Sequence, residues 1–387
     1  MKKSLTMVFA VMAILVLVVS ACAPAATPAP TQPPATEAPT EVVATEAPTE
    51  AATEAPTTAP TEAATEAATV APPTATAAPP PACEKLPDAP AAPAAGQLGA
   101  ADNPIVITFV PSGDTGKITT AGTAIADCLS KMTGLNFKME VGTTFAASIE
   151  ALGAEKAQVG FLNTFSALLA GAKYGVSPAL VAVRKYATND LDPDKALSGQ
   201  LEPFYKGQFI ANVDSGINSF ADLKGKTFCF VDPNSTSGYI VPRIILAANG
   251  INPDTDFAAT QNAGSHNNVA IAVYKGDCDA GVTYINVLTD SSANLAAQYP
   301  DITDKVKVFA VTDPIPNDGM QFIKNLDPNL KKVIVEGMMA MAQDPGGKAV
   351  LKSLYNYDNF QEVDPTFYND FLAVLQKAGV DPASLVK

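Results

Sequence analysis

Alternating strand-like and helix-like segments from residue 104 onward constrain the fold of this chain more than any other feature. Strand patterns lie at 104–110, 135–141, 158–162, 179–183, 227–231, 280–285 and 306–311. Helical patterns lie at 119–133, 146–152, 164–174, 237–249 and 266–275, and the tail from Asp327 is mostly helical. This order predicts an α/β fold in which helices flank mostly parallel sheets.

The alternation runs to about residue 183 and restarts near Phe220, which indicates two lobes. The chain would cross between them near 208–212 and 319–323. We therefore expect lobe 1 to comprise 99–212 and 318–387, and lobe 2 to comprise 213–317. Ligands of such folds bind at the carboxyl ends of the strands, here in the cleft between two lobes that close on the ligand.

The N-terminus predicts export. Residues 1–21 combine Lys2 and Lys3 with an apolar run that is short for a membrane span, as in a signal peptide. The small residues before Cys22 resemble a bacterial lipobox, which implies lipid attachment to Cys22 and anchoring on the outer face of the cytoplasmic membrane. The alternative is an ordinary cleaved signal with an incidental cysteine.

A low-complexity segment follows, and we assign residues 22–98 to the lipidated cysteine and a disordered linker. Its composition collapses to Ala, Pro, Thr and Glu, with Thr-Glu-Ala-Pro starting at 36, 45 and 53. Such a segment buries too little apolar surface to offset the entropy of folding. Its prolines favour an extended polyproline II spacer, which suits a tether between membrane and domain.

Charge and cysteine content narrow the function. The whole chain has a net charge of −14. Without the seven glutamates of 23–82 and the two lysines of the signal, the folded part has a net charge of −9. This negative charge argues against nucleic acid as a partner. If the chain binds an anion, nearby hydrogen-bond donors must attract it, because no basic cluster lies near Ser235, the candidate site residue described below.

Cys229 and Cys278 are the best candidates for a disulfide among the domain cysteines. No Cys/His spacing indicates a metal, and we expect no cofactor.

The stretch 232–239 carries the clearest chemistry. Ser235, Thr236 and Ser237 lie where a strand pattern passes into a helical one, and Gly238 would let an anion approach the backbone. The start of a helix offers unpaired N–H groups and positive potential, so added hydroxyl groups suit an oxyanion site. The simpler alternative is that Ser235 only caps the helix.

This stretch and four others resemble the phosphonate-binding (PhnD-type) substrate-binding proteins of ABC importers. The others are Val241-Pro242, 262–266 with 270–273, 279–282 and 315–318. The resemblance implies a type II periplasmic-binding-protein fold, no catalytic activity and an ABC permease as partner. We expect a monomer that binds no nucleic acid and meets the membrane through its lipid anchor.

The resemblance also implies the ligand residues. Ser235, Thr236, Ser237 and His266, the only histidine, would hold the phosphorus oxyanion. Binders of aminoalkylphosphonates carry tyrosines and a carboxylate pair; here Phe145 and Leu162 replace the tyrosines and Asn286 one carboxylate, which weakens the case for such ligands. Further candidate ligand residues are Asp318, Tyr284, Thr144, Asn163 and Thr164.

The sequence thus predicts a lipid-anchored receptor for a phosphonate, phosphite or phosphate. The same fold could instead bind a sulfonate or a small organic acid. A hydrolase using Ser235 or Ser237 with His266 as base is a third reading, although no nucleophile-elbow motif accompanies these residues. A sensor or adhesion protein presented on the long tether is a fourth.

Overall fold

The computed structural model describes residues 79–385. The predicted signal peptide, Cys22 and the linker up to residue 78 lie outside this range. Across 79–385, none of the helices combines the length and apolar character that a membrane span requires.

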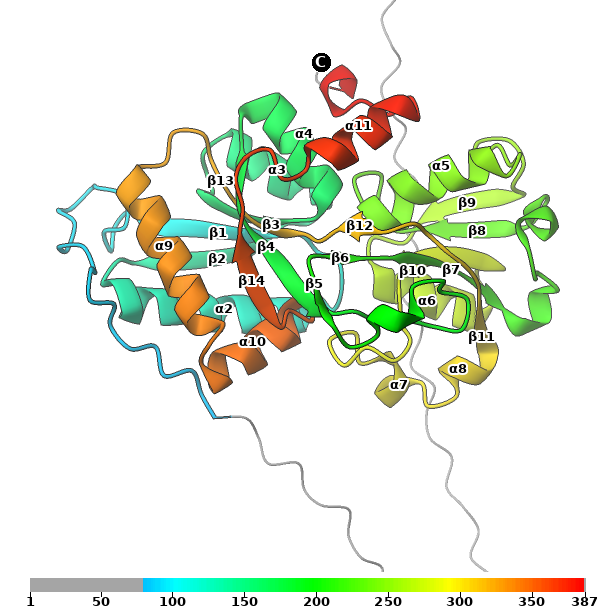
Figure 1. Ribbon diagram of the computed structural model, residues 1–387, viewed down its shortest axis with the longest axis horizontal. Helices are drawn as coiled ribbons and strands as arrows, with labels where there is room; N and C mark the ends of the chain where they lie inside the picture. The colour runs from blue at the N-terminus through cyan, green and yellow to red at the C-terminus, as the bar shows by residue number, and fades with distance from the viewer. Residues whose placement is uncertain (1–78, 386–387) are drawn as a thin grey trace, which may run out of the picture. The chain divides into compact units, whose positions relative to one another are not determined.

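A seven-stranded sheet forms the first lobe (Figure 1). Its order is β14 (Asn359–Glu362), β4 (Ser177–Lys185), β13 (Gly319–Phe322), β3 (Val159–Leu162), β1 (Ile105–Phe109) and β2 (Phe137–Val141), with β5 (Leu201–Glu202) beside β4. Helices α2 (Thr115–Thr133), α9 (Pro328–Met341) and α10 (Pro345–Tyr355) pack together. Helices α3 (Phe145–Gly153) and α4 (Thr164–Tyr174) form a second packed pair, and α11 (Asn369–Lys377) follows near the C-terminus.

A five-stranded sheet forms the second lobe, in the order β11 (Val306–Val311), β7 (Gly207–Asn212), β10 (Ala280–Tyr284), β8 (Thr227–Phe230) and β9 (Ala259–Asn262). Its helices are α5 (Val241–Ala248), α6 (His266–Lys275), α7 (Leu295–Gln298) and α8 (Ile302–Lys305), and a π-helical turn, η4 (Thr236–Ile240), leads into α5. Two short strands, β6 (Phe204–Tyr205) and β12 (Ile315–Pro316), pair with each other where the chain passes between the lobes. The two-lobe α/β architecture expected from the sequence is confirmed.

Two details of the expected topology need correction. The sheets are mixed, because the strands that follow the crossings, β7 and β13, run antiparallel to both of their neighbours. Strand β7 also belongs to the second sheet, so lobe 1 ends near residue 206 and not at 212. The second crossing, through β12, lies next to the expected boundary at 317/318.

Local signals explain why helix positions followed so closely from the sequence. Helix α4 occupies the expected 164–174, because Asn163 accepts a hydrogen bond from the N–H of Ser166 (3.1 Å) at its start. Helix α6 occupies the expected 266–275, with Ser265 as the corresponding cap. Helix α2 ends at Gly134, whose φ of 75° lies in the left-handed region that glycine tolerates best.

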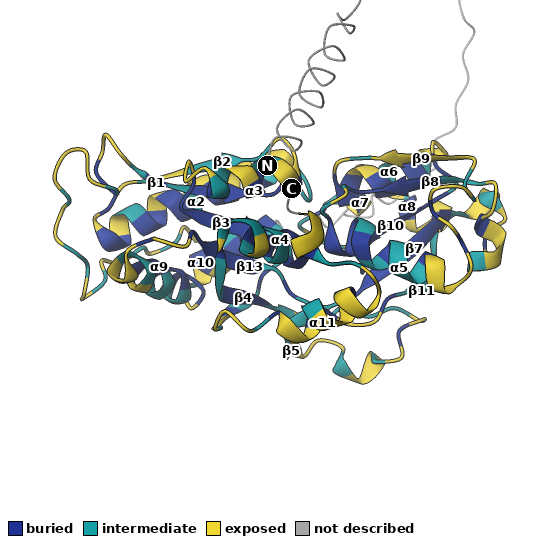
Figure 2. Ribbon diagram, turned by 90° about the horizontal axis from the view of Figure 1, so that it is seen from above, coloured by how far each residue is buried: buried dark blue, intermediate teal, exposed yellow. Residues whose placement is uncertain are grey.

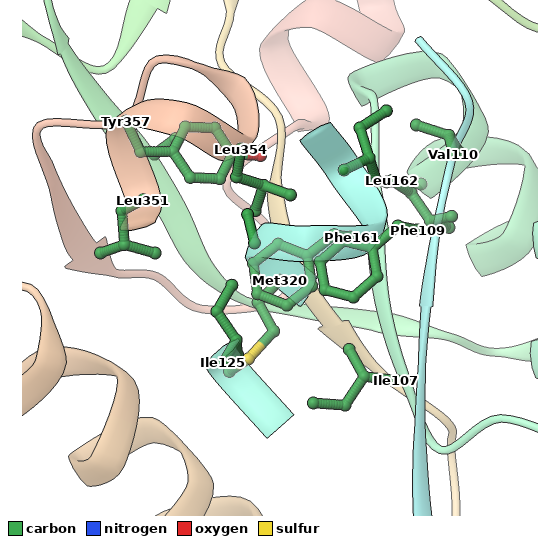
Figure 3. Close-up of a cluster of buried hydrophobic side chains, with 14 of the residues drawn as sticks. Ile107, Phe109, Val110, Ile125, Phe161, Leu162, Met320, Leu351, Leu354 and Tyr357 are labelled. Carbon is green, nitrogen blue, oxygen red and sulfur yellow. The ribbon is translucent and has the colours of Figure 1, made fainter. Parts of the chain in front are cut away.

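The core of lobe 1 lies on both sides of its sheet (Figures 2 and 3). The rings of Phe109 on β1 and Phe161 on β3 stack with centroids 4.8 Å apart, and both side chains are fully buried. Tyr357, directly after α10, is also fully buried next to them. This rigid core packing matters for function because the loops that leave β1 and β3 reach the cleft between the lobes.

Two disulfides brace the lobes. Cys229 on β8 bonds to Cys278 just before β10, which confirms the expected pair. Cys83 bonds to Cys128 on α2, a pairing that the sequence did not indicate. The N–H of Leu86 also donates to the carbonyl of Met132 (2.8 Å). The described end of the predicted linker, residues 79–98, therefore belongs to lobe 1, so assigning all of 22–98 to a disordered tether was wrong for this part.

Candidate functional site

A cavity of about 100 Å³ lies between the lobes. The sequence predicts that six loops at strand ends face this cleft: 111–114, 143–145, 163–165, 232–238, 263–266 and 313–318. Each contributes to the cavity wall, through Ser112, Phe145, Asn163, Ser235–Ser237, His266 and Asp318 respectively. This agrees with the rule that α/β folds bind ligands at the carboxyl ends of their strands. At about 30 Å³ for each water in the liquid, this volume corresponds to roughly three waters, which suits a small ligand.

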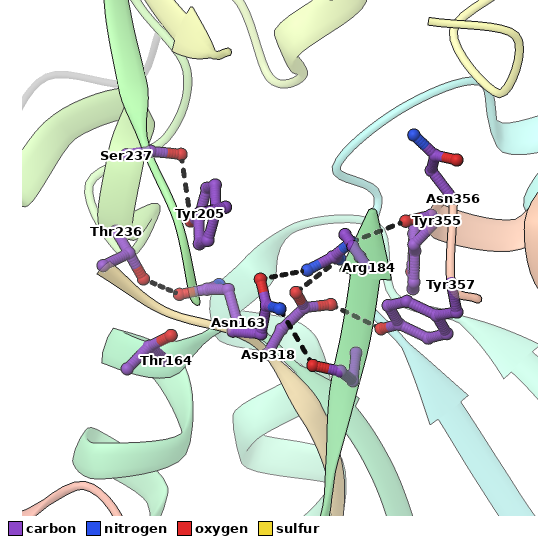
Figure 4. Close-up of polar contacts among 12 residues, drawn as sticks. Asn163, Thr164, Arg184, Tyr205, Thr236, Ser237, Asp318, Tyr355, Asn356 and Tyr357 are labelled. Carbon is purple, nitrogen blue, oxygen red and sulfur yellow. Dashed lines mark hydrogen bonds and ion pairs between the residues drawn. The ribbon is translucent and has the colours of Figure 1, made fainter. Parts of the chain in front are cut away.

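The Ser-Thr-Ser turn opens η4, and each hydroxyl has a different environment. Ser235 caps the turn by accepting from the N–H of Gly238 (3.2 Å). Thr236 donates to Asn163 Oδ1 (2.7 Å) and accepts from the N–H of Phe165 (2.9 Å), so its hydroxyl joins the two lobes (Figure 4). Among residues 79–385, no acceptor takes the hydroxyl hydrogens of Ser235 and Ser237, so both are available to a ligand.

Two expectations about this turn change. Ser235 both caps the turn and lines the cavity, so the two alternatives for this residue do not exclude each other. Gly238 is needed for packing, because a Cβ there would come within 2.3 Å of Val231 Cγ2. An approach of an anion to its backbone is not what requires a glycine at this position.

His266 begins α6 and is 5% exposed. Its Nδ1 accepts a hydrogen bond from the N–H of Tyr284 (3.1 Å), which places the ring proton of the neutral form on Nε2. Burial lowers the pKa of His266 to about 3, so the ring is neutral at pH 7. His266 is therefore a neutral donor. Its Nδ1 accepts from a backbone N–H, whereas the Nδ1 of a catalytic histidine base would donate to an orienting acid.

Tyr205 on β6 supports the turn from the crossing strand. Its hydroxyl donates to Ser237 Oγ (3.1 Å), which leaves the hydrogen of Ser237 free to turn toward the cavity (Figure 4). Burial raises the pKa of Tyr205 to about 12, so it remains a donor at neutral pH. Nothing in the sequence around Tyr205 pointed to this role.

Arg184 at the end of β4 is the main residue that the sequence reading missed, although its statement that no basic cluster lies near Ser235 is compatible with a single arginine. It lines the same cavity, and its Nη2 lies 2.5 Å from Asp318 Oδ1. Burial alone would lower the pKa of Arg184, but Asp318 and Tyr357 outweigh it and raise this pKa. The only available signal was an arginine directly after a buried strand.

The remaining candidates divide into two groups. Phe145, Asn163, Tyr284 and Asp318 line the cavity as expected. Thr144, Thr164 and Asn286 do not. Thr144 caps α3 by accepting from Ala147 (3.1 Å), Thr164 donates to the carbonyl of Pro316 (2.6 Å), and Asn286 donates to the carbonyl of Thr188 (3.1 Å). Sequence reasoning missed several lining residues, namely Lys117, Arg184, Tyr205, Asn267, Asp290, Ser292, Tyr355 and Asn356.

Comparison with known proteins places this site in a family. A family model described as "ABC transporter, phosphonate, periplasmic substrate-binding protein" matches residues 107–368. The "Phosphate-import protein PhnD" of Mycolicibacterium smegmatis is 26% identical over 251 residues, covering 60% of this chain and 74% of that protein. The "Phosphonates-binding periplasmic protein" of Escherichia coli is 35% identical over 156 residues, covering 39% of this chain and 45% of that protein.

Solved structures show the same fold. A binding-protein component of an ABC phosphonate transporter from Pseudomonas aeruginosa aligns with a TM-score of 0.59 at 23% identity, covering 71% of this chain and 87% of that one. PhnD1 from Prochlorococcus marinus, solved with methylphosphonate, also has a TM-score of 0.59, at 18% identity and 71% and 98% coverage. Members of the matched family are extracytoplasmic binding components, not enzymes, and they work with a permease. The chain belongs to the phosphonate family of periplasmic substrate-binding proteins of ABC transporters.

Proposed function

We propose that this chain is a lipid-anchored receptor that captures a small phosphorus oxyanion, a phosphonate, phosphite or phosphate, and delivers it to an ABC permease as a monomer. One observation carries the proposal. Three donors meet at one buried cavity. They are the hydroxyl groups of Ser235 and Ser237, whose hydrogens have no acceptor among residues 79–385, and the Nε2–H of His266. A phosphorus oxyanion offers mainly acceptor oxygens, so this donor set suits it.

The first turn of η4 supports the same assignment. The backbone N–H groups of Thr236 and Ser237 have no hydrogen-bond partner among the described residues. Such N–H groups bind anions through short, charge-assisted hydrogen bonds. The printed names of the Mycolicibacterium and Escherichia relatives, phosphate import and phosphonates binding, agree with a phosphorus ligand.

Contacts between the lobes support capture by closure. Besides the Thr236–Asn163 bond, Ser166 Oγ donates to the carbonyl of Asn234 (3.2 Å), and the N–H of His266 donates to the carbonyl of Ser112 (3.0 Å). Each bond joins lobe 1 to lobe 2 next to the cavity. A ligand that enters must break and remake them, so its binding is coupled to opening and closing of the lobes.

Titration calorimetry on the full chain in detergent tests the ligand class, with phosphite, methylphosphonate, phosphate, sulfate and taurine. We expect binding of phosphorus compounds and a loss of about 1–3 kcal/mol in Ser237→Ala, because a hydrogen bond to a charged group is removed. Ser353→Ala, an exposed serine on α10, is the matched control and should bind like the wild type. Binding of taurine or sulfate alone would favour the sulfur alternative and end this proposal.

The lipid anchor needs its own test, because Cys22 lies outside the described residues. Cells that express the chain would be fed a clickable fatty acid and separated into membrane and soluble fractions. We expect the wild type to carry the label in the membrane fraction and Cys22→Ala to carry none. Equal labelling of both forms would exclude Cys22 as the attachment site.

A further inference from the structure

The carboxylate of Asp318 lies in the cavity wall but is already occupied. Its Oδ1 accepts from Arg184 Nη2 at 2.5 Å, and its Oδ2 accepts from the hydroxyl of Tyr357 (Figure 4). The side chains of Arg184 and Asp318 are each 17% exposed. A ligand group that sought this carboxylate would have to compete with a partly desolvated guanidinium.

Arg184 is held in this position from several sides. Nη1 donates to Asn317 Oδ1 (2.6 Å), and Nε donates to the carbonyl of Tyr355 (3.1 Å). Its guanidinium carbon also lies 5.7 Å from the ring centroid of Tyr205 and 4.8 Å from that of Tyr357. Displacing Arg184 would therefore cost several hydrogen bonds and two cation–π contacts at once.

Asn317 explains why the guanidinium cannot easily turn away. This side chain is fully buried, and its Nδ2 donates to the carbonyls of Ala182 (2.8 Å) and Glu202 (3.0 Å). Its oxygen is therefore fixed toward Arg184. Contacts within the protein therefore hold the Arg184–Asp318 pair in place, and the pair does not depend on a ligand.

Two other charged groups at the cavity have hydrogen-bond partners of their own. Asp290 accepts from the N–H (2.7 Å) and hydroxyl (2.9 Å) of Ser292 and from Asn356 Nδ2 (3.1 Å). Lys117 Nζ donates to the carbonyl of Ser291 (2.8 Å). The wall beyond the Ser-Thr-Ser turn is otherwise largely aromatic, with Phe204, Tyr205, Tyr284 and Tyr355. An organic substituent on the ligand would thus meet rings and satisfied polar groups.

The size of the cavity limits such a substituent to a few heavy atoms. Its volume of about 100 Å³ corresponds to that of roughly three waters in the liquid, at about 30 Å³ each. An ammonium group there would lose its hydration and would have to compete with Arg184 for Asp318, or with the neutral donors that already bind Asp290 and Asp114, which is unfavourable.

Building on the function proposed above, we infer that Arg184 determines ligand specificity. By occupying Asp318 it selects phosphorus oxyanions that carry a short neutral substituent and disfavours those that carry an ammonium group. Arg184 acts here as a positioning residue, because it controls whether the Asp318 carboxylate is available. Two features that are separate from the oxyanion donors, the closed ion pair and the aromatic wall, carry this inference.

A ligand panel tests it directly on the full chain by titration calorimetry. Ethylphosphonate and 2-hydroxyethylphosphonate should bind at least tenfold more tightly than 2-aminoethylphosphonate. Equal or tighter binding of 2-aminoethylphosphonate would overturn the inference while leaving the proposed function intact. If no phosphorus compound binds, the proposed function itself fails, so the two failures are distinguishable.

Arg184→Gln supplies the second readout. Removing the guanidinium leaves Asp318 without its cation, so the ratio of affinities for 2-aminoethylphosphonate and ethylphosphonate should rise at least tenfold. Arg243→Gln is the matched control, because Arg243 is the only other arginine and pairs with Asp254 on the surface. An unchanged ratio in a folded Arg184→Gln protein would contradict the inference, and if this variant does not fold, the wild-type panel decides alone.

Discussion

Protonation of His266 should limit the stability of the folded chain in mild acid. The pKa of this histidine falls from 6.5 to about 3 on folding, because the ring is buried. In the unfolded chain the ring gains a proton as the pH drops below about 6.5, whereas in the folded chain it stays neutral. The unfolded state then binds more protons, so the stability that the neutral ring contributes is present above this pH and is lost as the pH falls toward 3.

The magnitude follows from these two pKa values. Between pH 7.5 and pH 5.0 the unfolded chain is stabilised by proton binding worth about 2 kcal/mol, while the folded chain takes up almost no proton at this site. The carboxyl groups with lowered pKa values lose their contributions mainly below about pH 4. The window from 7.5 to 5.0 therefore excludes these groups, and Asp232, whose pKa burial raises, is common to the wild type and a His266 variant, so its effect cancels when the two are compared.

Urea denaturation at several pH values within this window provides the assay. Far-UV circular dichroism and tyrosine fluorescence should give coincident transitions, which would justify a single free energy of unfolding. His266→Asn is the comparison, because an amide oxygen can still accept from the N–H of Tyr284 and the side chain does not titrate. The wild type should lose about 2 kcal/mol more than this variant. Parallel pH profiles of the two proteins would refute the neutral, buried assignment.

Three further outcomes are expected. Thr236→Val removes a hydroxyl that forms hydrogen bonds across the lobes, so ligand binding should weaken by about 1–3 kcal/mol. The ligand-loaded variant should also show a larger radius of gyration in solution scattering, and an unchanged radius would contradict the bridging role of Thr236. Tyr205→Phe removes one donor to Ser237 and should weaken binding by about 0.5–1.5 kcal/mol in calorimetry without changing the melting temperature. The double variant Cys83→Ala/Cys128→Ala opens a loop of 45 residues and should lower the free energy of unfolding by about 2–4 kcal/mol, matching the effect of a reducing agent on this bond; no loss would mean that the bond does not form.

Much of the fold could be predicted because its signals are local. Helices α4 and α6 occupy the expected residues, since Asn163 and Ser265 cap them and glycines follow their last turns. The Cys229–Cys278 pair was also accessible, because both cysteines fall within one predicted lobe. The Ser-Thr-Ser turn stood out for a similar reason, since hydroxyl residues at a helix start have a recognisable chemistry, whereas His266 was indicated by the family resemblance.

The crossings and the first disulfide were harder to place. A strand pattern such as Gly207–Asn212 has the same appearance whichever sheet it joins, so only its pairing with β10 and β11 assigns it to lobe 2. Cys83 lies at the end of a segment with linker composition, and its bond to Cys128 depends on how that segment packs on α2.

By itself, the sequence determined the elements, the two-lobe class and the place of the Ser-Thr-Ser turn at a helix start, because periodicity, caps and short motifs act over a few residues. Tertiary structure alone decided which polar groups are free. It joins Arg184 to Asp318 across 134 residues of sequence and commits the Thr236 hydroxyl to Asn163 across 73. Such pairings arise when distant segments meet, and they decide what a donor or a carboxylate can still offer to a ligand.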